Sequence, residues 1–373
     1  MSHSYEDRHD VAVIGGGAIG LAVAWRARQR GLSVVLVDKG DLGRGASHVA
    51  AGMLAPVAEA DPGERALLEL GLRSARSWPS FAAELEEVSG RPVGYRESGT
   101  LVVARDRDEA EALERELALR ERLGLRVERL LPSAARRLEP ALTPSLRAAF
   151  HAPDDHTVDP RRLTAALAVA AARAGVEYRV GQEVSAVVPG EGVEIEGRQT
   201  VAAARVVVAG GAWSGAIPGV PAVPVRPVKG QTLRLRSRPG EAPLLERPVR
   251  YEGGYLVPRQ DGSVVLGATV EEQGFDLALT AGGLYELLRD ASELVPGALE
   301  LEVTETVAGL RPGTPDNAPL LGELDGVLFA TGHHRNGVLL TPVTAELVAA
   351  QLAGETAIDP AFAPGRFAAR ATA

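Results

Sequence analysis

The stretch DVAVIGGGAIGLAVAWRARQRGLSVVLVDKG, residues 10–40, decides the fold of the N-terminal part of the chain. It begins with a short apolar run, 11–14, of the kind that forms a buried strand. A second apolar run, 33–37, ends in Asp38. Between the two runs lie apolar positions at helical spacing and three glycines in the pattern G-x-G-x-x-G, namely Gly15, Gly17 and Gly20. The order strand, glycine turn, helix, strand predicts a parallel βαβ unit.

Each part of this unit suits a bound dinucleotide. Glycines permit a tight turn and let the backbone approach a pyrophosphate, whose charge the free N–H groups of the helix N-terminus attract. An acid at the end of the second strand, here Asp38, hydrogen-bonds a ribose hydroxyl. A glycine motif alone would be weak evidence for a dinucleotide site, but here the strand, the helix and the terminal acid all stand at the expected positions around it. We therefore expect this unit to bind a dinucleotide.

Composition narrows the class of protein. The chain has 373 residues, enough for about two domains, and it is 45% hydrophobic and 24% charged, as in an ordinary globular enzyme. Its net charge of -9 disfavours nucleic acid and anionic membrane surfaces as partners. The chain contains no apolar run of the roughly 18 residues that a membrane span needs. Because the first residues also lack a basic leader, we expect a cytoplasmic protein.

The absence of cysteine excludes several chemistries. With no cysteine there is no disulfide, no catalytic thiol, no iron–sulfur cluster and no flavin attached through sulfur. The basic residues are almost all arginine, since the lysines are Lys39 and Lys229. A single arginine is therefore weak support for a binding site unless its surroundings single it out.

The next segment favours a flavin over a nicotinamide dinucleotide. GRGASHVAAGMLAP, 43–56, is a run of small residues directly after the acid, and it would let the backbone pass close to a large ring system. Its apolar Val49, Met53 and Leu54 indicate a packed loop rather than a free one. No second G-x-G-x-x-G is present, although flavoproteins that also dock a nicotinamide cofactor usually carry two.

The rest of the chain indicates a composite fold. Asp159 and Pro160 mark the start of one helix, and Thr341 is expected to cap another within a strand, glycine loop and helix at 326–354. Helical patterns cover 62–88, 106–124, 158–175 and 281–295, and strand-like segments fill 97–105, 176–180, 205–214 and most of 225–301. His333 and His334 are adjacent on a loop without a nearby carboxylate, so no metal site is expected.

Three segments resemble the D-amino-acid-oxidase superfamily of FAD enzymes, and within it the glycine oxidases of thiamine biosynthesis. They are GGGAIGLAVA, the GRGAS and AAGMLAP loop, and AGLRPGTPDNAPLLG followed by ATGHHRNGVLLTP. The resemblance covers about residues 8–355. It implies an α/β (α+β two-domain) fold in which a Rossmann-like FAD-binding domain, 1–92, 152–224 and 304–373, interleaves with an antiparallel-sheet substrate domain, 93–151 and 225–303.

The resemblance also implies a set of FAD contacts. FAD would be held non-covalently, although His48 offers a conceivable tether, and the dipole of the helix after Thr341 would point at the flavin. The implied cofactor-binding residues are Gly15, Gly17, Ala18, Ile19, Gly20, Asp38, Lys39, Arg44, Ala46, Ser47, Ala51, Gly52, Met53, Val184, Ala209, Gly210, Trp213, Arg311, His334, Arg335, Asn336, Gly337, Val338 and Leu339.

Four residues are implied in substrate binding. Arg311 matches the arginine that holds the substrate carboxylate, a role that suits a planar, permanently charged donor. Tyr255 matches a tyrosine whose hydroxyl reaches the same carboxylate, and Met53 would line the pocket. Arg335 would lie near substrate or flavin, although a structural ion pair is an equal alternative. The pair Gly253-Gly254, where relatives have a polar residue just before the tyrosine, leaves the size of the pocket open.

The activity that the resemblance implies is the oxidation of glycine, with sarcosine and small D-amino acids as further substrates. The partners would be glycine or another small amino acid or N-methyl amine, together with molecular oxygen, and the sequence leaves a homo-oligomer open. A sarcosine oxidase, a broader D-amino-acid oxidase and a quinone-linked dehydrogenase are alternatives within the fold. A non-catalytic nucleotide-binding protein is the alternative from a different class. The sequence does not decide among these substrates and acceptors.

Overall fold

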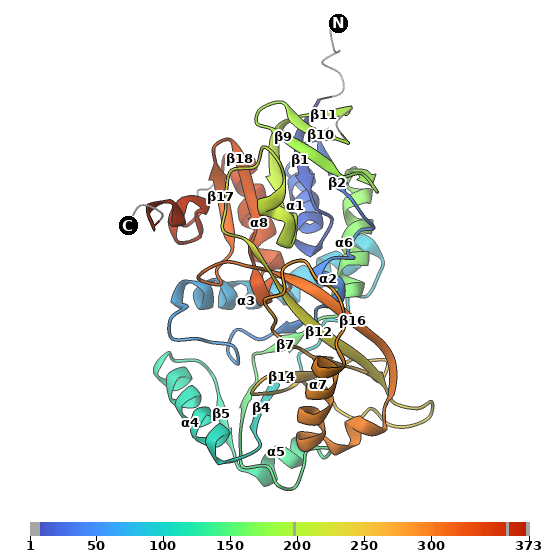
Figure 1. Ribbon diagram of the computed structural model, residues 1–373, viewed down its shortest axis with the longest axis vertical. Coiled ribbons are helices and arrows are strands. Elements are labelled where there is room, and N and C mark those ends of the chain that lie inside the picture. The colour runs from blue at the N-terminus through green and yellow to red at the C-terminus, as the bar shows by residue number, and fades with distance from the viewer. Residues whose placement is uncertain (1–7, 197–198, 356–357, 371–373) are drawn as a thin grey trace, which may run out of the picture.

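Two eight-stranded sheets form the frame of the protein in a computed structural model that describes residues 8–196, 199–355 and 358–370. The first sheet occupies the upper half of Figure 1 and the second occupies the lower half. A two-stranded sheet, β3 (Met53–Leu54) with β7 (His156–Thr157), is the third. The mixture of a parallel and an antiparallel sheet confirms the predicted fold class.

The first sheet contains the predicted βαβ unit. Its strand order is β17-β18-β11-β1-β2-β8, and β10 and β9 extend β11 as an antiparallel ribbon. All neighbours in the main path are parallel except β17 and β18. The strands are β1 (His9–Ile14), β2 (Val34–Asp38), β8 (Glu177–Val180), β9 (Val184–Val188), β10 (Gly192–Ile195), β11 (Gln199–Val208), β17 (Leu320–Leu324) and β18 (Val327–Thr331).

Both faces of this sheet are covered, which explains its continuous apolar strands. Val11 and Val13 point into one core and Ala12 and Ile14 into another, because successive side chains of a strand face opposite sides. The first core is closed by helices, with α1 packed against α6 and α8, and α3 against the same two. These helices are α1 (Ala18–Gln29), α3 (Arg65–Ser89), α6 (Pro160–Arg173) and α8 (Thr341–Leu352).

The second sheet has the order β16-β12-β15-β14-β13-β4-β6-β5. Its pairs are antiparallel, as expected, with the exception of β13 and β4, which run parallel. A parallel pair needs a long connection, and more than a hundred residues separate β4 from β13. The strands are β4 (Thr100–Ala104), β5 (Glu128–Leu130), β6 (Ala148–Ala152), β12 (Arg226–Arg236), β13 (Val249–Tyr251), β14 (Gly254–Pro258), β15 (Ser263–Gly267) and β16 (Glu302–Gly313).

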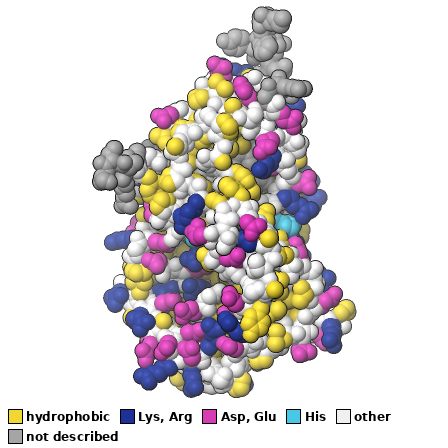
Figure 2. All heavy atoms as spheres, in the orientation of Figure 1, with side chains coloured by type: hydrophobic (Ala, Val, Ile, Leu, Met, Phe, Trp, Pro, Cys, Tyr) yellow, Lys and Arg dark blue, Asp and Glu magenta, His cyan; other side chains and the backbone are white. Residues whose placement is uncertain are grey.

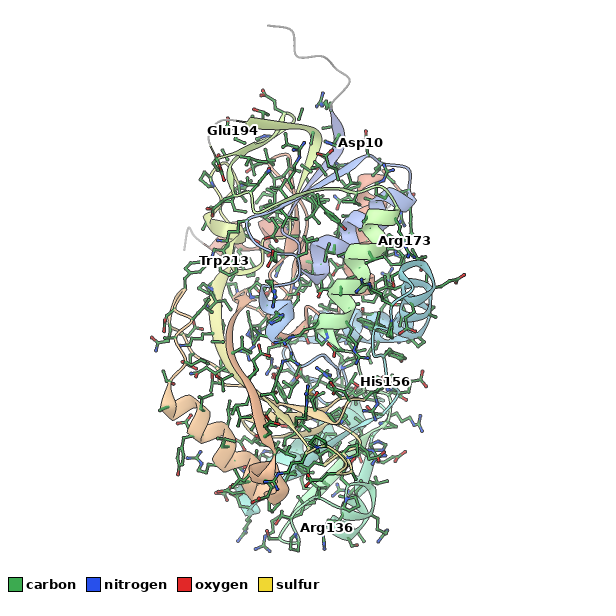
Figure 3. The ribbon with its side chains drawn as sticks, turned by 90° about the vertical axis from the view of Figure 1, so that its right-hand side faces the viewer. Asp10, Arg136, His156, Arg173, Glu194 and Trp213 are labelled. Atoms are coloured by element: carbon green, nitrogen blue, oxygen red, sulfur yellow. The ribbon has the colours of Figure 1, made fainter. Side chains whose placement is uncertain are left out.

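Helices also pack on the second sheet. The apolar side of α7 (Ala281–Leu294) presents Leu287, Ala291 and Leu294 to the core. On the other side α4 (Arg107–Arg122) packs on β4 and β6 through Leu113 and Leu117. A shorter helix, α5 (Pro132–Leu138), lies at the far end of this half, where Figure 3 labels Arg136.

The predicted helices are confirmed with small shifts in their ends, but one cap is wrong. Asp159 caps α6 as expected, since its Oδ1 accepts hydrogen bonds from the backbone N–H groups of Arg161 at 2.9 Å and Arg162 at 3.2 Å. Thr341 does not cap α8. It is the first helical residue, and its hydroxyl donates to the Gly337 carbonyl at 2.8 Å, so it bonds the preceding turn instead of a helix N–H.

The strand β16 bears on the division into domains. It runs beside β12 along its whole length, so residues 304–313 belong to the second sheet although they fall in the segment 304–373 proposed for the FAD-binding domain. The domain bounds remain a proposal. We propose that β16 is the segment where the chain passes from one half of the molecule to the other.

The surface shows no separation of charge on the face in view. Positive and negative side chains are interspersed there, as Figure 2 shows. Within the described ranges, no helix combines the length and the apolar character needed to cross a membrane.

Candidate active site

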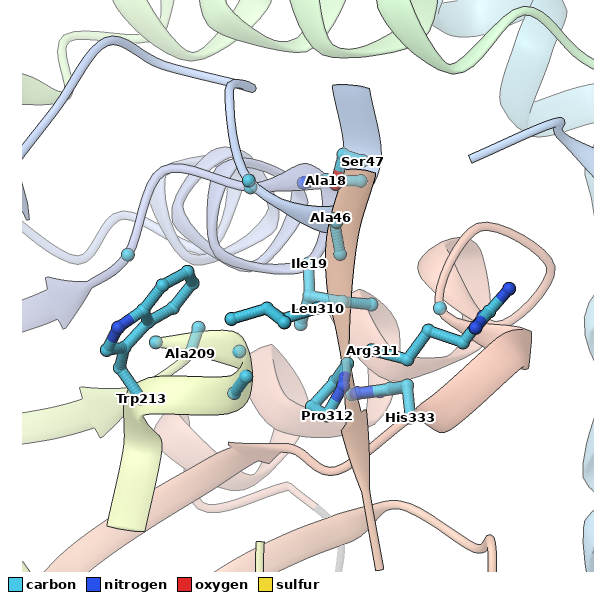
Figure 4. Close-up of a pocket in the computed structure, with 18 of the residues that line it drawn as sticks. Ala18, Ile19, Ala46, Ser47, Ala209, Trp213, Leu310, Arg311, Pro312 and His333 are labelled. Carbon is cyan, nitrogen blue, oxygen red and sulfur yellow. Dashed lines mark hydrogen bonds between the residues drawn. The ribbon is translucent and has the colours of Figure 1, made fainter. Parts of the chain in front are cut away.

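A cavity of about 510 Å³ lies where the two sheets meet, within the size range of small-molecule sites. From the first half it is lined by the turn before α1, the end of β2 and the segment after β11. From the second half β12, β14 and β16 contribute. Figure 4 shows Trp213 on one side of this space and Arg311 with Pro312 on the other, with Ile19 and Leu310 between them.

The glycine turn forms one end of the cavity. Gly15 has φ +106°, and a Cβ atom there would lie 2.4 Å from the Ala209 carbonyl oxygen. A Cβ atom on Gly20 would lie 1.9 Å from the Gly15 carbonyl oxygen. Larger residues are therefore excluded at both positions, and α1 can begin close against β1 and β11.

The N-terminal end of α1 lies at the cavity. Gly17, which precedes the helix, supplies no side-chain cap, and both it and Ala18 line the cavity. Ser47 lies opposite, and its Oγ accepts a hydrogen bond from the Ala18 N–H at 3.1 Å. A helix N-terminus in this position attracts the negative charge of a pyrophosphate.

Asp38 lies at the end of β2, as the motif predicts. Its carboxylate accepts hydrogen bonds from the N–H groups of Gly16, at 2.5 Å, and Gly40, at 2.8 Å. These bonds fix its orientation beside the cavity that it lines. Lys39 follows, with its ammonium 4.7 Å from the centre of the Trp213 ring. Lys39 and Trp213 therefore lie against each other at this end of the cavity.

The small-residue loop after β2 is packed, as the sequence indicated. A Cβ atom on Gly52 would lie 2.1 Å from the Val158 carbonyl oxygen. Arg259, which is buried, donates hydrogen bonds to the carbonyls of Ala51 and Val158. Met53 lies on β3, lines the cavity and packs near Tyr255.

Most residues predicted to bind the cofactor line this one cavity. The exceptions are Gly20, Asn336 and Leu339. Gly20 serves the packing of α1, and the Leu339 carbonyl accepts hydrogen bonds from Ser74 and Trp78 in the core. The predicted residues that line it are Gly15, Gly17, Ala18, Ile19, Asp38, Lys39, Arg44, Ala46, Ser47, Ala51, Gly52, Met53, Val184, Ala209, Gly210, Trp213, Arg311, His334, Arg335, Gly337 and Val338.

Arg311 projects from β16 into the same cavity. Its Nη1 donates to the carbonyl oxygens of Thr269, at 3.1 Å, and Lys229, at 3.3 Å. Its guanidinium lies directly over Gly230, because a Cβ atom there would be only 2.4 to 2.6 Å from it. No acidic side chain forms an ion pair with Arg311 among the described residues, so its charge is free for an anionic ligand.

Tyr255 lies on β14 beside this guanidinium. Burial raises the pKa of its hydroxyl, whereas the charge of Arg311 and a hydrogen bond from it act in the opposite direction. Both groups line the cavity and can donate hydrogen bonds to one carboxylate. The sequence-based proposal for this pair is therefore compatible with its geometry. Arg335 also lines the cavity but is exposed, and no described residue forms an ion pair with it.

The two adjacent histidines both line the cavity but have different partners. His333 is buried, and its Nε2 lies 3.0 Å from the Thr344 hydroxyl; burial lowers its pKa to about 3. His334 lines the cavity at φ +46°, and burial together with Arg335 and Arg311 lowers its pKa to about 4. Its Nδ1 is buried without a hydrogen-bond partner among the described residues, which suits a site that receives a polar ligand.

His48 does not line the cavity. Its Nε2 lies 3.3 Å from Arg44 Nη1 and 3.8 Å from a carboxylate oxygen of Glu305, and it is absent from the lining. Within the described ranges, no three side chains of the metal-binding kind come together.

Glu59 is a cavity residue that the sequence reasoning missed. It lies on the turn directly after the AAGMLAP segment and lines the cavity together with Tyr255 and Arg311. The one available signal was an acid placed six residues beyond Met53, at the end of an otherwise apolar loop.

The chain matches the family described as DAO, FAD dependent oxidoreductase, over residues 10–351. The chain belongs to this family. FAD is accordingly the dinucleotide, and the glycine turn, the start of α1, Asp38 and the buried Nδ1 of His334 all fit such a ligand.

Two relatives and one solved structure show the closeness of the match. A glycine oxidase of Geobacillus kaustophilus is 37% identical over 353 residues, which are 92% of this chain and 92% of the relative. The crystal structure of glycine oxidase from Geobacillus kaustophilus covers 96% of this chain and 99% of that one, with a TM-score of 0.90 and 36% identity. The bifunctional protein ThiO/ThiG of Trichormus variabilis is 36% identical over 91% of this chain and 52% of the relative.

Proposed function

We propose that this protein oxidises glycine with FAD and molecular oxygen. Glycine, oxygen and water would give glyoxylate, ammonia and hydrogen peroxide, with the imine of glyoxylate as the first product. The relatives named as glycine oxidases support this substrate, and the bifunctional ThiO/ThiG relative supports supply of the imine to thiazole formation for thiamine.

One observation carries the proposal. Arg311 and Tyr255 lie side by side in the cavity that also contains the dinucleotide cradle. An amino-acid carboxylate needs a planar charged donor, and Arg311 has no competing acid among the described side chains. A carboxylate bound there is held at the boundary between the two halves, where ligands of such folds bind.

The protein's own part in the reaction is orientation. Arg311 and Tyr255 fix the carboxylate, Met53 supplies an apolar wall, and the packed loop around Gly52 limits the space. When bound, FAD supplies the acceptor for the hydride that leaves the substrate Cα. Holding the Cα in one orientation raises the rate, because the translational and rotational entropy of the reacting atoms is already lost when the substrate binds.

The substrate range follows from the same pocket. Neither Gly253 nor Gly254 lines the cavity, and a Cβ atom on Gly254 would lie 2.5 Å from the Tyr251 hydroxyl, so this pair does not enlarge the pocket. Sarcosine and small D-amino acids are further substrates in our proposal. We place the enzyme in the cytoplasm.

The test is product analysis on the purified, FAD-loaded protein. With glycine as the sole substrate and air present, glyoxylate, ammonia and hydrogen peroxide should form in equal amounts. Oxidation of sarcosine or D-alanine without any turnover of glycine would overturn the assignment of glycine while retaining the family.

A further inference from the structure

Glu59 brings a negative charge to the substrate end of the cavity. Its carboxylate forms no hydrogen bond or ion pair with any described residue. It is close enough to the Tyr255 hydroxyl that its charge adds to the effect of burial in raising that pKa, against Arg311. Glu59, Tyr255 and Arg311 therefore share one space, and Glu59 and Arg311 bring opposite charges to it.

Two buried side chains hydrogen-bond the backbone just before Glu59. Asp155 is fully buried, and its two carboxylate oxygens accept hydrogen bonds from the N–H groups of Val57, at 3.0 Å, and Ala58, at 2.6 Å. Arg120 is also buried, and it donates to the carbonyl oxygens of the same two residues, at 2.8 Å and 2.6 Å. All four backbone polar groups of this dipeptide are thus hydrogen-bonded by two side chains that do not line the cavity.

Asp155 and Arg120 are both buried charged side chains. Burying a carboxylate and a guanidinium costs free energy unless they make bonds that the fold requires. Here both side chains bond the backbone and their opposite charges attract each other. Among the described residues, Arg120 also forms an ion pair with Glu116, which is 3.3 Å away and half-exposed. The clamp of Asp155 and Arg120 therefore fixes the position of the residue that follows, which is Glu59.

The chemistry of the substrate supplies the function. An amino acid has a carboxylate and an amino group on one carbon, so a site that orients it benefits from opposite charges on opposite sides. Resting on the proposed oxidation of glycine, we propose that Glu59 binds the amino group of the substrate while Arg311 and Tyr255 bind its carboxylate. Asp155 and Arg120 are positioning residues, which act through Glu59 without touching the substrate.

The test compares two ligands that differ in the amino group. Holoenzyme kept reduced in the absence of oxygen cannot accept a hydride, so glycine and acetate can both be titrated as simple ligands by calorimetry. In Glu59→Gln the dissociation constant of glycine should rise by about 10- to 150-fold, the effect of losing a charged hydrogen bond. Acetate should bind as well as before or more tightly, because a repulsive charge has been removed.

Two further variants separate the alternatives. Glu69→Gln removes the same charge from the exposed side of α3, paired with Arg65, and should change neither titration. Asp155→Asn should weaken glycine more than acetate if the clamp acts through Glu59. An equal loss for both ligands would show that Asp155 merely supports the whole pocket and would overturn its positioning role.

Failure of this inference can be told apart from failure of the proposed function. If Glu59→Gln binds glycine as tightly as the wild type, Glu59 has no part in recognising the amino group, while oxidation of glycine stands. If the wild type binds glycine no better than acetate and does not oxidise it, the proposed function falls and this inference falls with it.

Discussion

Gly230→Ala should weaken the substrate site without damaging the fold. Gly230 lies on β12, and a Cβ atom there would approach Arg311 Nη1 to 2.4 Å and Nη2 to 2.5 Å. Ordinary contact requires about 3.5 Å, so the guanidinium must move by about 1 Å. The move is possible because the obstructing atoms are the end of a flexible side chain, and the backbone of Gly230 is not in the left-handed region.

The size of the effect follows from that displacement. A shift of about 1 Å in a substrate-positioning group costs about 100-fold in rate. The same shift weakens charged hydrogen bonds that contribute about 1.5–3 kcal/mol, equivalent to about 10- to 150-fold. We therefore expect kcat/KM for glycine to fall by about 10- to 150-fold, with the melting temperature almost unchanged.

Oxygen consumption with glycine measures this effect, and the FAD content of each preparation normalises it. Gly282→Ala is the matched control, since nothing lies within 4 Å of the added Cβ on α7, and this change should leave kcat/KM as it is. A folded, FAD-loaded Gly230→Ala protein with the wild-type kcat/KM would refute the role of Arg311 as the carboxylate ligand.

Three further predictions concern the arginine of the substrate site, the glycine turn of the cofactor site and the pH dependence of stability. Arg311→Ala should cost about 2–5 kcal/mol of substrate binding, about 30-fold to several-thousand-fold, in an inhibition assay with acetate, and an unchanged inhibition constant would contradict it. Gly20→Ala places a Cβ atom 1.9 Å from the Gly15 carbonyl oxygen, so the purified protein should contain less FAD by visible absorbance; full FAD content would contradict this reading. His333 has its pKa lowered from 6.5 to about 3 by burial, so the folded state stays unprotonated as pH falls below 6.5 while the unfolded state takes up a proton, and stability is lost. His333→Gln keeps a partner for Thr344 and should reduce the loss of unfolding free energy between pH 7 and pH 5 by about 2 kcal/mol, measured in urea; an equal loss in both proteins would disprove the linkage.

The N-terminal unit could be predicted because its signals are local. The glycine turn, α1 and Asp38 follow one another within residues 10–40, and each has a conformational reason that holds in any protein. The predicted cap of α8 is wrong because a local rule left two hydrogen bonds open. A threonine hydroxyl can accept a hydrogen bond from a helix N–H, or it can donate one to a nearby carbonyl. The sequence does not show which of the two forms, and in Thr341 the hydroxyl donates to the Gly337 carbonyl.

The clamp behind Glu59 lay beyond sequence reasoning. Asp155 and Arg120 reach Val57 from 98 and 63 residues away, and nothing in the local pattern of either residue indicates that it is buried. Likewise, Gly230 looks like any glycine in a strand until β16 places Arg311 over it. Such pairs depend on how the two sheets meet, which the strand pattern alone does not define.

The central claim is that glycine itself reduces the bound FAD. The most direct measurement mixes the FAD-loaded protein with glycine in the absence of oxygen and follows the visible flavin spectrum. We expect the yellow colour to bleach, and to return with formation of hydrogen peroxide when air is admitted. A spectrum that glycine leaves unchanged would contradict it.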